Sequence, residues 1–73
     1  MKKFAERLKY LRKEKKLSAK ALGKIIKVSY NTIVNWENNI HDIKGEYLIR
    51  LAKFFDVTTD YLLGLEDKNL KRA

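Results

Sequence analysis

Apolar residues recur at helical spacing in short segments along most of this 73-residue chain, and no proline interrupts them. Helices must therefore dominate, and their ends have to be read from capping residues and from the periodicity itself. The alternating pattern of a strand does not persist anywhere. A chain of this length provides a single hydrophobic core, because two domains would leave neither with enough buried surface. The sequence thus predicts one all-α domain.

Five helices are predicted between capping signals. Their expected ranges are 2–15, 19–26, 30–38, 44–55 and 59–63. Ser18, Ser29 and Thr58 stand directly before the second, third and fifth helices, where a hydroxyl can accept a free backbone N–H. Gly64 follows the last helix as a natural C-terminal stop. The residues expected on the buried faces of the first two helices are Phe4, Leu8, Leu11, Lys15, Leu22, Ile25 and Ile26.

The helix predicted over residues 30–38 has an unusual outer face. Thr32, Ile33 and Trp36 cluster on the side that can be buried. The opposite arc carries Tyr30, Asn31, Val34, Asn35 and Asn38. This arc holds no charge, whereas an ordinary solvated face would carry Glu, Lys or Arg. Because an asparagine amide offers a donor and an acceptor together to adenine, the arc is a candidate for reading base edges.

The net charge of +8 is concentrated at one end of the chain. Residues 1–27 hold eleven basic and two acidic side chains, and the remaining residues hold six basic and seven acidic ones. Such a field attracts a polyanion, which could be nucleic acid or an acidic membrane.

The residues that several classes of function require are absent from the sequence. Without cysteine, and with His41 as the only histidine, the chain offers neither a disulfide nor a usual zinc site. No set of nucleophile and base is visible, and no run approaches the roughly 20 apolar residues that span a bilayer. We therefore expect a cytoplasmic protein that is no enzyme and that needs no cofactor, metal or small-molecule ligand.

The second and third predicted helices are joined by about three residues, so they must cross steeply as a helix-turn-helix. Residues 17–39, LSAKALGKIIKVSYNTIVNWENN, resemble that motif in the Cro/phage-repressor-type regulators, the Xre family. Residues 48–65, LIRLAKFFDVTTDYLLGL, resemble the stretch that closes the same domain. The resemblance implies a compact five-helix, lambda-repressor-like domain over residues 1–65, followed by a polar tail over 66–73. It also implies a transcriptional regulator, usually a repressor, that binds double-stranded DNA as a homodimer.

Residue by residue, the resemblance implies distinct roles. Base-reading positions fall on Tyr30, Asn31, Val34 and Asn35. Phosphate contacts fall on Ser18, Lys20, Ser29, Asn38 and Lys44. Arg12 and Glu37 match an ion pair that fastens the first helix to the third. A self-association surface is expected at Tyr61, Leu63 and Leu65, because so short a helix cannot bury every apolar side chain.

Five residues depart from the family pattern, and two of them, His41 and Asp42, stand in a loop that is often more basic. Ala19 replaces a common glutamine, and Lys27 and Asn39 each replace a common glycine.

Two other functions fit parts of the sequence. A protein-interaction module of the same fold, such as an antitoxin, would need a large apolar surface, and the polar tail argues against one. A membrane-surface module would use the apolar face of the first helix opposite its lysines, although core packing explains that face equally well.

Overall fold

The computed structural model describes residues 1–69, so residues 70–73 of the predicted tail lie outside the described residues. It contains five α-helices. They are α1 (Lys2–Glu14), α2 (Ala19–Ile26), α3 (Tyr30–Glu37), α4 (Gly45–Phe55) and α5 (Thr59–Leu63). No strand occurs within residues 1–69. Each predicted helix is present, and no predicted end is wrong by more than one residue.

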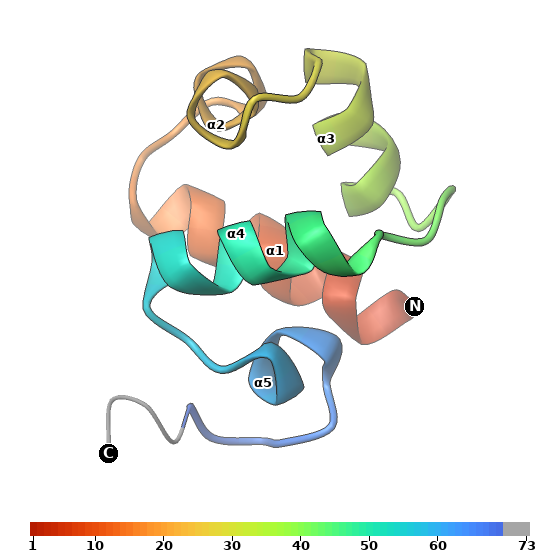
Figure 1. The fold of residues 1–73 in the computed structure, drawn as a ribbon, viewed down its shortest axis with the longest axis vertical. Coiled ribbons are helices and arrows are strands. Elements are labelled where there is room, and N and C mark those ends of the chain that lie inside the picture. Colours follow the sequence, from red (N-terminus) through yellow and green to blue (C-terminus); the bar gives the residue numbers. More distant parts are fainter. Residues whose placement is uncertain (70–73) are drawn as a thin grey trace.

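The helices are arranged along an axis of 31 Å (Figure 1). α2 and α3 lie together at one end of this axis, α5 lies at the other end, and α1 and α4 lie between them. α1 packs against both α3 and α5, so it connects the two ends.

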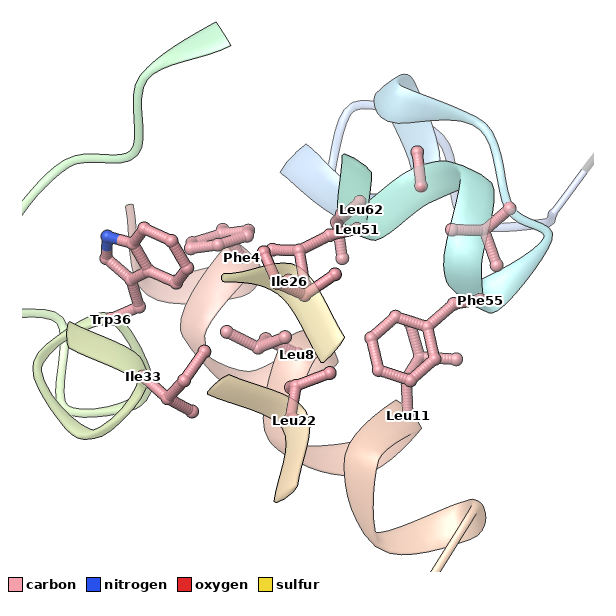
Figure 2. Close-up of a cluster of buried hydrophobic side chains, with 12 residues drawn as sticks. Phe4, Leu8, Leu11, Leu22, Ile26, Ile33, Trp36, Leu51, Phe55 and Leu62 are labelled. Carbon is pink, nitrogen blue, oxygen red and sulfur yellow. The ribbon is translucent and has the colours of Figure 1, made fainter. Parts of the chain in front are cut away.

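One core joins all five helices (Figure 2). Its buried side chains are Phe4, Leu8, Leu11, Leu22, Ile26, Ile33, Trp36, Leu51, Ala52, Phe55, Val57 and Leu62. The rings of Phe4 and Trp36 meet edge to face, with their centroids 6.5 Å apart. Since the apolar face of α1 is buried in this core, it is not available for insertion into a membrane surface.

The predicted caps explain why the helices begin and end where they do. The hydroxyls of Ser18, Ser29 and Thr58 each accept the backbone N–H three residues later, at 3.0, 3.2 and 3.0 Å. Gly64 ends α5 with a left-handed backbone, at a φ of 86°. These four predictions are confirmed.

Two predictions of burial were wrong. Ile25 is 46% exposed, because the side of α2 that meets the core is formed by other residues, among them Leu22 and Ile26. Lys15 follows the last residue of α1 and is exposed, with its ammonium 5.4 Å from the centroid of the Phe54 ring. A cation above an aromatic ring at the edge of the core replaces the burial that periodicity predicted.

Within residues 1–69, four residues other than glycine have a left-handed backbone. They are Lys16, Lys27, Asn39 and Asp56, with φ between 56° and 66°. Lys27 and Asn39 are the two positions at which the family resemblance implies a glycine. The backbone at these positions therefore keeps the conformation that favours glycine, although the side chain has changed.

Replacing Lys27 by glycine is expected to raise the free energy of unfolding by about 1 kcal/mol, because glycine adopts this φ without strain. Lys24→Gly is the matched control, since it removes the same side chain from the interior of α2 and should lower stability by about 1 kcal/mol. Urea unfolding of the two variants measures both effects. A Lys27→Gly variant as unstable as Lys24→Gly would contradict the assignment of strain to this turn.

Candidate nucleic-acid interface

The connection between α2 and α3 is a tight turn of three residues, 27–29. The Val28 N–H donates to the Gly23 carbonyl at 2.9 Å, which closes the end of α2. The backbone of the turn passes so close to Gly23 that a Cβ there would lie 2.8 Å from the Val28 carbonyl oxygen. In Figure 1, α2 is seen almost end-on while α3 runs along the page, so the two helices cross steeply. This is the geometry of a helix-turn-helix.

The two faces of α3 differ as the sequence predicts. Ile33 and Trp36 are buried, and they hold α3 against the core. On the outer face Tyr30 is 55% exposed. Asn31 is exposed as well, and Asn35 is half-buried. Within residues 1–69 the side-chain amides of these two asparagines form no hydrogen bond, so both can bond to another molecule.

The other two residues of the outer face lie toward the C-terminal end of α3. Val34 is half-buried, whereas Asn38 is exposed at the C-terminal cap of α3. The outer face therefore offers one unbonded amide in its N-terminal turn and a second one turn later, with the apolar Val34 beside it. A protein helix that reads base edges with its N-terminal residues has this arrangement.

A bidentate ion pair fastens the C-terminal end of α3 to α1. Arg12 Nε lies 2.6 Å from Glu37 Oε2, and Arg12 Nη2 lies 2.9 Å from Glu37 Oε1. The two side chains are only 14% and 8% exposed. The hydrogen bond to Glu37 raises the pKa of the Arg12 guanidinium. The pair implied by the resemblance is thus present, and it carries two buried charges that satisfy each other.

Arg12 also reaches the loop that precedes α2. Its Nη1 donates to the Leu17 carbonyl at 2.8 Å. One guanidinium therefore connects α1, the end of α3 and the start of α2, and it holds the outer face of α3 in a fixed direction.

The five residues expected to contact phosphate are all exposed. They are Ser18, Lys20, Ser29, Asn38 and Lys44. The Ser18 and Ser29 hydroxyls already cap helices, and Ser29 Oγ lies 2.9 Å from Thr32 Oγ1. Lys44 precedes α4, and its side chain forms no cap.

Arg50 is a residue of the site region that the sequence analysis missed. It extends from α4, and its Nη1 donates to the Ile26 carbonyl at 3.1 Å. This bond holds the last residue of α2, directly before the turn. The guanidinium also lies 5.2 Å from the centroid of the Tyr47 ring. An arginine on an amphipathic helix is normally interpreted as solvated, and a carbonyl partner leaves no signal in the sequence.

Comparison with known proteins places this geometry in a family. The model of the helix-turn-helix family matches residues 8–62. The chain belongs to this family. The predicted fold class, an all-α lambda-repressor-like domain with a helix-turn-helix, is confirmed as well. The crystal structure of the P22 c2 repressor bound to a synthetic operator superposes on it with a TM-score of 0.79. That structure is 35% identical, and the match covers 85% of this chain and 94% of the repressor chain.

Two curated relatives carry the names of a repressor and of a transcriptional regulator. The repressor protein C2 of Salmonella phage P22 is 40% identical over 60 residues, which are 82% of this chain and 28% of that protein. The HTH-type transcriptional regulator YobD of Bacillus subtilis (strain 168) is 33% identical over 76 residues, covering 93% of this chain and 68% of YobD. The chain thus spans less than a third of the C2 repressor. Among residues 1–69, no helix is long and apolar enough to cross a membrane.

Proposed function

We propose that this chain is a sequence-specific DNA-binding transcriptional regulator that acts as a repressor and reads the major groove of double-stranded DNA with α3. The observation that carries the proposal is the outer face of α3. It presents two free asparagine amides and no charge, and the Arg12–Glu37 pair holds it to the rest of the domain. The similar P22 c2 repressor was crystallised with a synthetic operator, which supports the same partner here. The proposal includes a cytoplasmic location and no enzymatic activity.

Each residue of the outer face has a chemical role in this proposal. Asn31 and Asn35 bond base edges through their amides, and Val34 contacts a thymine methyl group. Tyr30, at the N-terminus of α3, contacts a base or a phosphate. The phosphate-contacting residues are Ser18, Lys20, Ser29, Asn38 and Lys44. The excess of basic side chains over residues 1–27 adds an attraction to DNA that does not depend on sequence.

Asn31→Ala and Asn35→Ala are expected to reduce discrimination between a preferred duplex and a random one by about 1–3 kcal/mol each, if each amide bonds one base. Lys20→Ala is the control, because loss of a phosphate contact weakens binding to all sequences alike. Fluorescence anisotropy with the two duplexes measures both affinities for each variant. Full discrimination in both asparagine variants would show that α3 is not the reading helix.

We further propose that two copies bind DNA together, through Tyr61, Leu63 and Leu65 of the domain formed by residues 1–65. Leu65, directly after the Gly64 cap of α5, is 73% exposed and leaves its apolar side chain free to contact a second copy. Tyr61 and Leu63, which precede Leu65 closely in the sequence, are half-buried. One such domain buries little DNA, whereas a two-fold pair doubles the contacts and binds half-sites about 34 Å apart.

A further inference from the structure

Arg7 of α1 is the centre of a cluster that holds the chain after α5. Its side chain is only 18% exposed. Nη1 donates to the backbone carbonyls of Tyr61 and Glu66, and Nη2 lies 3.8 Å from Asp67 Oδ1. The guanidinium also lies 4.3 Å from the centroid of the Tyr61 ring. One side chain therefore joins α1 to α5 and to the two residues 66 and 67 beyond it.

Asn69 holds the same stretch from its other end. Its Oδ1 accepts the Thr58 N–H at 3.2 Å, and its Nδ2 donates to the Asp56 carbonyl at 3.0 Å. Both bonds connect it to the loop between α4 and α5. Segment 64–69, whose last four residues were predicted to begin the polar tail, is thus held by Arg7 at residues 66 and 67 and by Asn69 at its end.

Leu65 lies between Tyr61 and Glu66, the two residues whose backbone carbonyls Arg7 binds. Its own N–H donates to the Asp60 carbonyl at 2.8 Å, while its side chain is 73% exposed. The preceding Gly64 lies so close to α1 that a Cβ there would come within 2.5 Å of Lys3 Cβ. The backbone that carries Leu65 is therefore ordered by contacts with α1, although the side chain itself touches little of the domain.

We infer that Arg7 is a positioning residue for self-association on DNA: by holding segment 64–69 against α1, it keeps Leu65 in place for a second copy of the chain. The inference rests on the proposed function, in which two copies bind DNA together. Its physical basis is preorganisation. A segment that is already ordered loses less conformational entropy when two copies associate, so the complex is tighter.

The test compares variants on two duplexes made from a sequence selected by the parent chain, one with a single half-site and one with two. Arg7→Gln should bind the two-half-site duplex at least tenfold more weakly than Lys13→Gln. The two variants should bind the single half-site within twofold of each other. Lys13→Gln is the matched control because it removes the same charge from α1, at an exposed side chain that forms no hydrogen bond or ion pair within residues 1–69.

Amide hydrogen exchange provides a second readout that DNA does not influence. The Leu65 amide should exchange at least tenfold faster in Arg7→Gln than in Lys13→Gln. Arg7→Lys should not restore slow exchange, since lysine lacks both the planar guanidinium that lies over the Tyr61 ring and the second terminal nitrogen that faces Asp67. Asn69→Ala leaves α1 unchanged. It should also weaken binding to the two-half-site duplex and speed exchange of the Leu65 amide, so it tests the inference if Arg7→Gln does not fold.

The outcomes separate the inference from the proposed function. If Arg7→Gln and Asn69→Ala bind two half-sites as tightly as Lys13→Gln, the inference is overturned and DNA-bound pairing stands. If the parent chain gains no affinity from the second half-site, pairing fails and the inference fails with it. Sequence-specific binding would then still be judged on the single half-site.

Discussion

Replacing Glu37 by alanine should lower the free energy of unfolding by about 3 kcal/mol, because it leaves the charge of Arg12 shielded from water and without its partner. Both side chains are largely buried, and the bond between them is short and bidentate. In a domain of this size, a loss of that magnitude corresponds to a fall in melting temperature of roughly 15 °C.

The control for this variant is Glu46→Ala. Glu46 forms an ion pair with Arg50 at 3.8 Å, but its side chain is 61% exposed and that of Arg50 is 46% exposed. Exposed pairs contribute about 0–1 kcal/mol, so this variant should melt close to the parent. Thermal unfolding followed by circular dichroism measures both. Equal melting of the Glu37→Ala variant and the parent would mean that the buried pair does not hold α3.

Gly23→Ala should lower stability by about 2 kcal/mol, although alanine is the better helix former by about 1 kcal/mol. The added Cβ would meet the Val28 carbonyl oxygen at 2.8 Å, and this atom belongs to the backbone of the turn between α2 and α3. The turn cannot yield without moving α3 relative to α2.

Gly45→Ala is the same substitution at a position where nothing lies within 4 Å of the added Cβ. Gly45 is the first residue of α4, so alanine should raise stability by about 0.5 kcal/mol through a lower entropy of the unfolded chain. Chemical denaturation of the two variants should therefore give opposite signs. A Gly23→Ala variant that gains stability like Gly45→Ala would contradict the close packing of the turn.

The helices were predictable from the sequence because their ends carry local signals. A serine or threonine cap depends only on the backbone three residues away, so Ser18, Ser29 and Thr58 could be assigned without tertiary structure. It was harder to predict which face of α2 packs against the core. This helix has only eight residues, and three of its last five are apolar, so neighbouring helices decide that Ile25 is exposed.

The candidate site was predictable for a similar reason, and only in part. The uncharged outer face of α3 is a pattern within one helix, and its two amides form no hydrogen bond in the part of the chain that the structure describes. Arg7 and Arg50 gave no signal, because both bond backbone carbonyls that lie far away in the sequence. A carbonyl is present at every residue, so its use as a partner is visible only once the chain has folded.

Selection of bound sequences from a pool of random duplexes tests the central claim most directly. If α3 reads the major groove, successive rounds with the parent chain should converge on one motif, and Asn31→Ala with Asn35→Ala combined should lose that convergence. Pairing on DNA should make the motif two-fold symmetric, with half-site centres about one helical turn apart. A pool that stays random after repeated rounds, while the folded chain still binds duplex DNA, would contradict sequence-specific recognition by this domain.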